Sequence, residues 1–232
     1  MNITGVITGD IVASRKLPGK SRERLYSDLR KFLATLKTKG LLTAYEMFRG
    51  DSIQCIVKNK EQSLRAALMI RAWLKSYAVR TSAAKKKQVR NKKTGVVMPL
   101  IGKQDIRLSI GIGGVDFVKK NSLAHSDGEA FHLSGIGLDS LKTTTGKIIL
   151  ETADTTFNEA IEPSMLLLDA VLQKWTSNQA EIILFKLKNY KEEQIAREIG
   201  ISQSAVNQRT KTSQWSAIEK LLSWFEKTIK AW

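Results

Sequence analysis

Residues 192–211 read EEQIAREIGISQSAVNQRTK. The stretch holds two short runs with helical spacing on either side of a glycine. Ala196 is small where two helices would approach closely, and Gly200 permits the positive φ that a tight turn requires. Ile195 and Val206 are spaced to pack the two runs against each other. The stretch therefore predicts a helix-turn-helix, with helices over 192–199 and 203–211.

The second of these helices presents amide and hydroxyl side chains and no acidic ones. Ser202 is placed to cap its N-terminus. Amide side chains pair with adenine edges in the major groove, arginine pairs with guanine, and lysine and serine suit phosphates. The helix therefore predicts contact with double-stranded DNA, and a helical hairpin used only for packing is the alternative. The predicted DNA-binding residues are Ser202, Gln203, Ser204, Asn207, Gln208, Arg209 and Lys211.

The chain of 232 residues carries a formal net charge of +16, which attracts polyanions such as nucleic acids and nucleotides. The basic excess is densest between Arg80 and Lys93, a segment without acidic residues. A solvated loop that keeps the protein in solution and a contact with the phosphate backbone both fit this segment. The residues expected to meet phosphates are Lys85, Lys86, Lys87, Arg90, Lys92 and Lys93.

Hydrophobic residues make up 42% of the chain and charged residues 26%, as in ordinary globular proteins. No apolar run approaches the roughly 18 residues that span a bilayer, so we expect no membrane partner. The N-terminus lacks a basic region before its apolar stretch, which argues against an export signal. Cys55 is the single cysteine and lies in an apolar run, which favours a buried thiol and a cytoplasmic location.

Hydrophobic spacing in the first 150 residues predicts the order β-α-β-β-α-β-α-β, the ferredoxin-like pattern with an added helix and strand. After Pro163 only helical patterns remain. We therefore predict an α+β chain with two domains, a ferredoxin-like domain over 1–160 and a small all-α helix-turn-helix domain over 161–232. The expected elements cover 3–10, 22–36, 42–48, 52–57, 61–78, 106–112, 128–141 and 147–150, then 164–175, 179–187, 192–199, 203–211 and 215–229.

Two aspartates follow glycines at the ends of predicted strands. Asp10 ends the first strand, and Asp51 lies in the turn between the second and third. In the ferredoxin-like topology these two points are neighbours. Paired carboxylates at strand ends can hold Mg²⁺, which in turn holds nucleotide phosphates. The alternative is that both are turn residues that accept hydrogen bonds from backbone amides.

Four motifs occur in order, ITGDIVASR at 7–15, FRGDSIQ at 48–54, RLSIGIGG at 107–114 and SDGEAFHLSG at 126–135. Together they resemble the SatD family of prokaryotic proteins over about residues 1–150. More distantly, they resemble the class III nucleotide cyclases and related palm-type domains. The cyclase resemblance implies a ferredoxin-like sheet and a homodimer. It also implies that Asp10 and Asp51 bind Mg²⁺ or Mn²⁺ with help from the backbone of Ile11.

The sequence departs from the cyclase pattern at two places. Cyclases present an asparagine and, four residues later, an arginine from the helix expected at 128–141, and these places fall near His132 and Ile136. The resemblance leaves Arg49 and Lys103 as the cations that could contact a nucleotide. For His132 a hydrogen-bonded structural role is expected in place of metal ligation.

Three functions follow from these patterns. The first is a DNA-binding transcriptional regulator whose cyclase-like N-terminal domain dimerises and binds a nucleotide or metal. The alternative is a metal-dependent nucleotidyl cyclase or nucleotidyltransferase-like enzyme with a helical adaptor tail. The third is a module that binds RNA or protein with neither activity. The amide-rich helix and the net charge favour the first, and the missing asparagine and arginine argue against the second.

Overall fold

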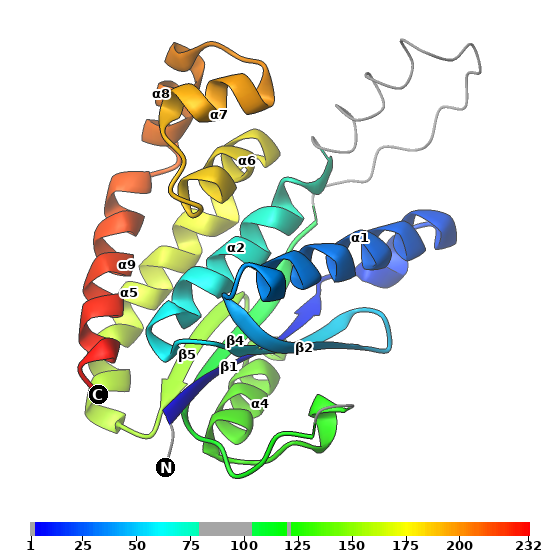
Figure 1. The fold of residues 1–232 in the computed structure, drawn as a ribbon, viewed down its shortest axis with the longest axis vertical. Helices are drawn as coiled ribbons and strands as arrows, with labels where there is room; N and C mark the ends of the chain where they lie inside the picture. Colours follow the sequence, from blue (N-terminus) through cyan, green and yellow to red (C-terminus); the bar gives the residue numbers. More distant parts are fainter. Residues whose placement is uncertain (1–2, 79–103, 120–121) are drawn as a thin grey trace.

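The computed structural model describes residues 3–78, 104–119 and 122–232. Its sheet has the strand order β2-β3-β1-β4-β5, with β4 and β5 parallel and the other neighbours antiparallel (Figure 1). The first four strands and the helices between them form the predicted ferredoxin-like order, to which a helix and β5 are added. The strands are β1 (Ile3–Ile11), β2 (Leu42–Phe48), β3 (Ser52–Val57), β4 (Ile106–Gly114) and β5 (Ile148–Thr152).

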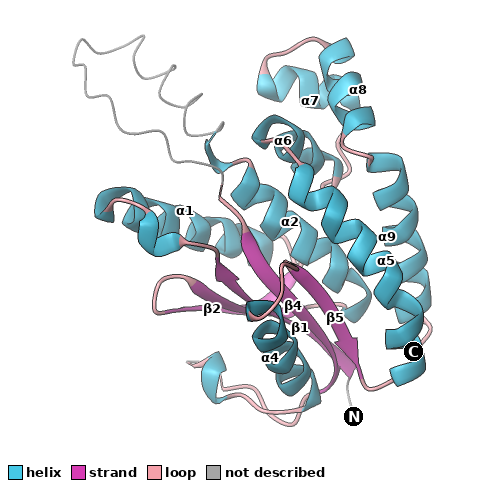
Figure 2. Cartoon of the chain, turned by 180° about the vertical axis from the view of Figure 1, so that it is seen from behind, coloured by secondary structure: helices cyan, strands magenta, loops and turns pink. Residues whose placement is uncertain are grey.

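Helices cover both faces of the sheet (Figures 1 and 2). The helices α1 (Gly19–Thr38) and α2 (Ser63–Lys75) pack on one face, and α4 (Glu129–Lys142) packs on the other. Alternation along the strands separates the two cores. Ile7 and Cys55 belong to the larger cluster with α1 and α2, whereas Val6 and Ile56 belong to a smaller cluster with α4. Cys55 is buried, as predicted, and burial raises the pKa of its thiol to about 12.

A glycine allows α4 to lie close to the sheet. A Cβ on Gly111 of β4 would lie 2.3 Å from the carbonyl oxygen of Ala130 and 2.6 Å from the backbone nitrogen of Ser134. Contacts this short are forbidden, so a larger residue at this position would push the helix away. The close approach holds the first turns of α4 against β4, where Gly111 is paired with Val6 of β1.

The helix α5 (Thr155–Lys174) corrects one prediction. We expected a helix from 164 with a break at Pro163, but the helix begins nine residues earlier and runs through the proline. Asp154 caps it by accepting a hydrogen bond from the backbone N–H of Phe157. Proline removes only one hydrogen bond of the helix, and Ile161 and Met165 are buried on either side of it.

The hydrophobic core continues from the sheet into the C-terminal helices. One cluster of buried residues includes Ile110 of β4, Leu168 of α5 and Phe225 of α9 (Trp215–Lys230). The buried face of α9 is therefore part of this core. The division at residue 160 stays a prediction, since α5 packs against β5 and its Phe157 also stacks on Trp224 of α9 (Figure 2).

Three short helices, α6 (Ser177–Lys186), α7 (Glu192–Ile199) and α8 (Gln203–Thr212), lie between α5 and α9. Ile182, Ile195 and Val206, one from each helix, form their own buried cluster. Gly200 adopts the left-handed conformation at φ 76°, and Ser202 caps α8 by accepting a hydrogen bond from the N–H of Ala205. The helix pair and its turn thus have the bounds predicted for them, within one residue. No helix in the described ranges is long and apolar enough to cross a membrane.

Candidate functional site

The two aspartates lie on neighbouring chain segments at one end of the sheet. Asp10 is paired across β1 and β3 with Ser52, the residue after Asp51. The backbone N–H of Ile11 donates a hydrogen bond of 2.9 Å to the carbonyl oxygen of Asp51. The prediction that the end of β1 and the β2–β3 turn lie side by side is confirmed.

Each carboxylate has one recorded partner. Arg107 of β4 donates from Nη1 to Oδ2 of Asp10 at 3.1 Å, and the hydroxyl of Ser14 donates to Oδ2 of Asp51 at 2.9 Å. Oδ1 of Asp10 is buried and has no hydrogen-bond partner. A buried carboxylate oxygen without a donor is unfavourable unless a cation or a polar group reaches it. This orphaned oxygen fits a divalent cation such as Mg²⁺, because such cations prefer oxygen ligands.

The same face of the sheet carries further polar groups without partners. Thr8 is paired with Gln54 on β3 and with Ser109 on β4, and residues paired across strands share a face. Oε1 of Gln54, Oγ of Ser109 and Nε of Arg107 are buried and have no hydrogen-bond partner. Together with Oδ1 of Asp10 they form a polar sheet face, defined by these four residues, that lacks groups to bond with.

Sequence reasoning missed three of these four residues. The signal was alternation, because Gln54, Arg107 and Ser109 occupy every second position of strands expected to be apolar. Their common face is visible only once the register of β1 against β3 and β4 is known.

The metal expectation rests on two carboxylates. In the described part of the chain no group of three or more His, Cys, Asp or Glu side chains is arranged to hold a metal ion. The side chain of Ile11 is buried, and its N–H is engaged by Asp51, so only its carbonyl could assist. Arg49 lies exposed in the hairpin turn at φ 47°, with no ion pair to a described residue. Lys103 lies outside the described residues.

The two histidines make local hydrogen bonds. His132 of α4 contacts Asp127 at 2.8 Å, and His125 contacts the hydroxyl of Ser122 at 2.7 Å. The contact of His132 agrees with the hydrogen-bonded role expected for it. Ile136, the other departure from the cyclase pattern, is 69% exposed on the outer face of α4.

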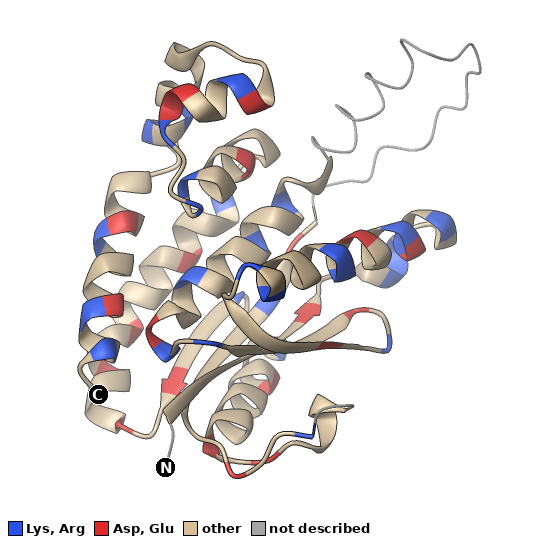
Figure 3. Cartoon of the chain, in the orientation of Figure 1, with Lys and Arg blue, Asp and Glu red and all other residues tan. Residues whose placement is uncertain are grey.

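The predicted DNA-binding residues divide into two groups. Gln203, Ser204, Asn207, Gln208 and Lys211 line one open surface hollow over α8, together with Glu192 of α7. Ser202 serves as the N-cap and Arg209 is half-buried, and neither lines the hollow. Asn207 donates from Nδ2 to the carboxylate of Glu192 at 3.3 Å, and Lys186 lies 3.5 Å from the same carboxylate. Acidic residues occur on α7 but not on α8 (Figure 3).

The basic cluster expected to meet phosphates lies outside the described residues. This applies to Lys85, Lys86, Lys87, Arg90, Lys92 and Lys93.

No protein-family model and no curated protein matches the chain. Among solved structures, a bacterial light-regulated adenylyl cyclase shares 17% identity at a TM-score of 0.37, covering 64% of this chain and 74% of that one. The adenylyl cyclase CyaB from P. aeruginosa shares 15% identity at a TM-score of 0.32, covering 60% of this chain and 71% of that one. Likenesses of this strength establish neither a common fold nor a common activity.

Proposed function

We propose that the end of the sheet at Asp10 and Asp51 binds a nucleotide together with a divalent cation. The observation that carries the proposal is the polar sheet face, where buried oxygen and nitrogen atoms of four side chains have no partner. Native proteins bond more than nine in ten of their buried polar groups. The orphaned atoms of Asp10, Arg107 and Gln54 are therefore best explained by a polar ligand that bonds them, whereas Ser109 is sealed beneath α4.

Different residues at this end of the sheet would contact different parts of the ligand. Asp10 and Asp51 would hold the cation, and the backbone carbonyl of Ile11 could complete its protein ligands. Arg15 and Lys16 are exposed on the turn that follows β1, where they can meet phosphates. A bound cation would supply neutralising charge for the phosphates, as Mg²⁺ does in other nucleotide sites.

The orphaned oxygen of Gln54 suits the uncharged part of a nucleotide. Oε1 of Gln54 accepts hydrogen bonds, whereas the hydroxyl of Ser109 is fully buried against Gly137 of α4, where a ligand does not reach it. Base and ribose edges present donors to such an oxygen. Nε of Arg107 is an orphaned donor next to Asp10, since Nη1 of this arginine already bonds that carboxylate.

The test is calorimetric titration of the full chain with each of the four nucleoside triphosphates, with and without Mg²⁺ or Mn²⁺. Binding that requires both nucleotide and cation, and that disappears in Asp10→Asn, is the expected result. Asp139→Asn is the matched control, because Asp139 is an exposed carboxylate on α4 paired only with Lys142. Absence of binding under all conditions would sink the proposal. Chromatography of the same mixtures for a cyclised or transferred product decides whether the site is a nucleotidyl cyclase or nucleotidyltransferase.

A second function, binding of double-stranded DNA by α8, is favoured by a separate observation. Five of the seven predicted contact residues line one exposed hollow, and α8 itself carries no acid. Such a face suits hydrogen bonding to base edges. The regulator hypothesis joins this surface to the nucleotide site in one chain. If the chain forms the homodimer that the family resemblance implies, its preferred DNA site is a near-palindrome with half-sites about 34 Å apart or a multiple of that.

Selection of binding sites from random duplex DNA tests this second function. Asn207→Ala should relax the selected sequence by about 1–3 kcal/mol of discrimination at one base position, with an unchanged salt dependence. Asn178→Ala makes the same chemical change at an exposed position of α6 and should leave the selection as it is. No duplex binding at low salt would rule this function out.

A further inference from the structure

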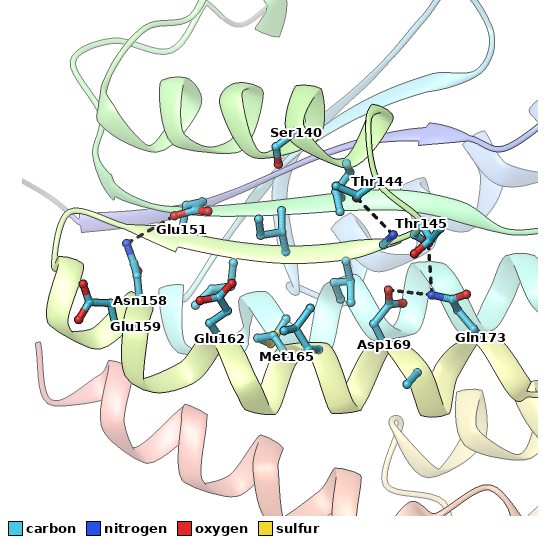
Figure 4. A pocket seen from close by; sticks show the side chains of 17 residues that line it. Ser140, Thr144, Thr145, Glu151, Asn158, Glu159, Glu162, Met165, Asp169 and Gln173 are labelled. Atoms are coloured by element: carbon cyan, nitrogen blue, oxygen red, sulfur yellow. Dashed lines mark hydrogen bonds between the residues drawn. The ribbon is translucent and has the colours of Figure 1, made fainter.

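A groove of about 560 Å³ runs along the free edge of the sheet at β5, which is separated from β1 and Asp10 by β4. Its floor is β5, with the end of α4 and the following turn on one side and α5 on the other (Figure 4). Apolar contact comes from Ile149, Met165 and Leu166, the last of which is 62% exposed. The groove is thus an elongated, partly apolar channel against a strand.

The strand at the bottom of the groove has unused hydrogen-bonding groups. In a parallel ladder alternate residues bond inward, and the N–H of Leu108 donates to the carbonyl of Lys147. The N–H and C=O groups of Ile148, Leu150 and Thr152 therefore face away from β4. Asn158 of α5 bonds both outward groups of Thr152, at 3.0 and 2.8 Å. These two bonds confirm that the N–H and C=O of Thr152 point away from β4. They also leave Thr152 unable to bond a further strand.

The outward groups of Ile148 and Leu150 stay open. No described strand pairs with this edge of β5, and no described residue hydrogen-bonds to these groups. Two N–H and two C=O groups remain, spaced over about 7 Å at 3.3 Å per residue. An edge of this kind is a template for one more strand.

The acidic side chains of the groove favour a basic partner. Glu151, Glu159 and Glu162 line it, and no Lys, Arg or His side chain does. The fourth acid, Asp169, is already paired with Arg71. Burial and, secondarily, the charge of Glu162 raise the pKa of Glu151. Glu151 and Glu162 thus repel each other, and no described Lys, Arg or His side chain forms an ion pair with Glu151, Glu159 or Glu162, so a basic ligand would supply the compensating charge.

We propose that the groove binds an extended segment of a partner protein, with lysine or arginine alternating with apolar residues, as an added strand on β5. The backbone of the segment bonds Ile148 and Leu150. Its basic side chains reach Glu159 and Glu162 on α5, and its apolar side chains, which alternate with them, contact Ile149 on the α4 face of β5. Strand addition of this type takes affinity from main-chain bonds and specificity from alternate side chains.

The experiment selects random heptapeptides displayed on phage against the full chain and synthesises the enriched sequence with a fluorescent label. We expect alternating basic and apolar residues, with binding followed by anisotropy. Glu162→Lys should weaken binding at least tenfold. Glu219→Lys should not, because Glu219 is an exposed acid of α9 outside the groove. Should Glu162→Lys melt early, Glu159→Lys at the exposed neighbouring position replaces it.

Two further measurements separate strand addition from simple charge attraction. N-methylation of the two central peptide bonds should abolish binding, and the peptide should slow amide hydrogen exchange at Ile148 and Leu150. Failure to enrich basic peptides, or insensitivity to the lysine substitutions, would overturn the proposal. Binding of spermidine as tight as that of the peptide, without protection of the two amides, would equally overturn it in favour of a small-cation site.

Discussion

Two arginines bond aspartates close to the start of β4, and they differ in how completely their side chains are hydrogen-bonded. Arg71 of α2 is fully buried, and its guanidinium bonds Asp105 at 2.9 Å and Asp169 at 2.6 Å. Lys75 adds a further cation at 3.3 Å from Asp105. Two residues after Asp105, Arg107 bonds Asp10 through one nitrogen, while its Nε has no partner. The first cluster is complete within the protein, and the second is not.

The difference separates structural charge from functional charge. The Arg71 cluster joins α2, the chain before β4, and α5, and Asp169 also accepts from the backbone N–H of Lys147 beside β5. A buried charge of this kind is tolerated because every partner is present. The Asp10–Arg107 pair retains unbonded atoms, as expected where a ligand supplies the missing partners.

The largest effect is expected from breaking the complete cluster. Arg71→Met leaves the buried Asp169 and the partly exposed Asp105 without their main cation, and removal of one partner of a buried ion pair costs about 3–5 kcal/mol. Urea unfolding of the variant measures the loss. Arg107→Met is the comparison, and because this pair makes a single hydrogen bond and already has unbonded atoms we expect a smaller loss than in Arg71→Met. Equal losses in the two variants would remove the distinction drawn between the clusters.

A smaller effect is expected when the incomplete site is filled. Nucleotide and cation at 100 times their dissociation constant should stabilise the native chain by about 2.7 kcal/mol, which is roughly 5–10 °C in melting temperature for a chain of this size. Asp10→Asn should abolish the shift without lowering the melting temperature of the free protein by more than a few degrees. Differential scanning fluorimetry measures both. A shift that survives in Asp10→Asn places the ligand elsewhere.

Acid should weaken the complete cluster selectively. Burial alone would raise the pKa of Asp105, but the charge and hydrogen bonds of Arg71, the charge of Lys75 and the N–H of Ile106 outweigh it and hold the pKa below the ordinary 3.8. A carboxyl with a lowered folded pKa stabilises the fold above its unfolded pKa, and this stabilisation is lost as pH falls below about 4. Unfolding free energies between pH 6 and 3 should therefore fall less steeply in Asp105→Asn than in the native chain. An unchanged slope would show that Asp105 does not contribute.

Sequence patterns predicted the ends of those helices and strands that are set by residues nearby in the chain. The ends of β2 and β3 follow from alternation and the turn at Gly50, and the end of α7 follows from Gly200. All three elements have the predicted ends. The start of α5 was wrong because Pro163 was taken as a break, whereas the Asp154 cap and buried residues on both sides maintain the helix. Local rules do not include these contacts between distant segments.

The candidate site shows the same limit. Asp10 and Asp51 could be paired from sequence, because a hairpin and the end of a strand are local features placed by a known topology. The orphaned atoms of Gln54 and Ser109 could not, since they depend on strand register and on burial beneath α4. The Arg71 cluster brings together residues up to 98 positions apart, and no pattern along the chain relates them.

The smallest effect is expected at Glu151, in the groove beside β5. Glu151 has Asn158 as a weak neighbour at 3.5 Å and no cation, and burial with the charge of Glu162 raises its pKa above the ordinary 4.5. A carboxyl with a raised folded pKa favours the fold most below its unfolded pKa, and stability is lost as pH rises through the folded value. Glu151→Gln keeps the shape and removes the charge, so at pH 7 it should stabilise the chain by a few tenths of a kcal/mol, about the size of an exposed charge interaction. Because the pKa of Glu151 is raised above 4.5, the gain should shrink as the pH falls to 4. Urea midpoints at the two pH values measure it, with Glu219→Gln as an exposed control that should change neither. A loss of stability at pH 7 would mean that the Glu151 charge is already compensated, and the groove would then have no electrostatic need for a basic partner.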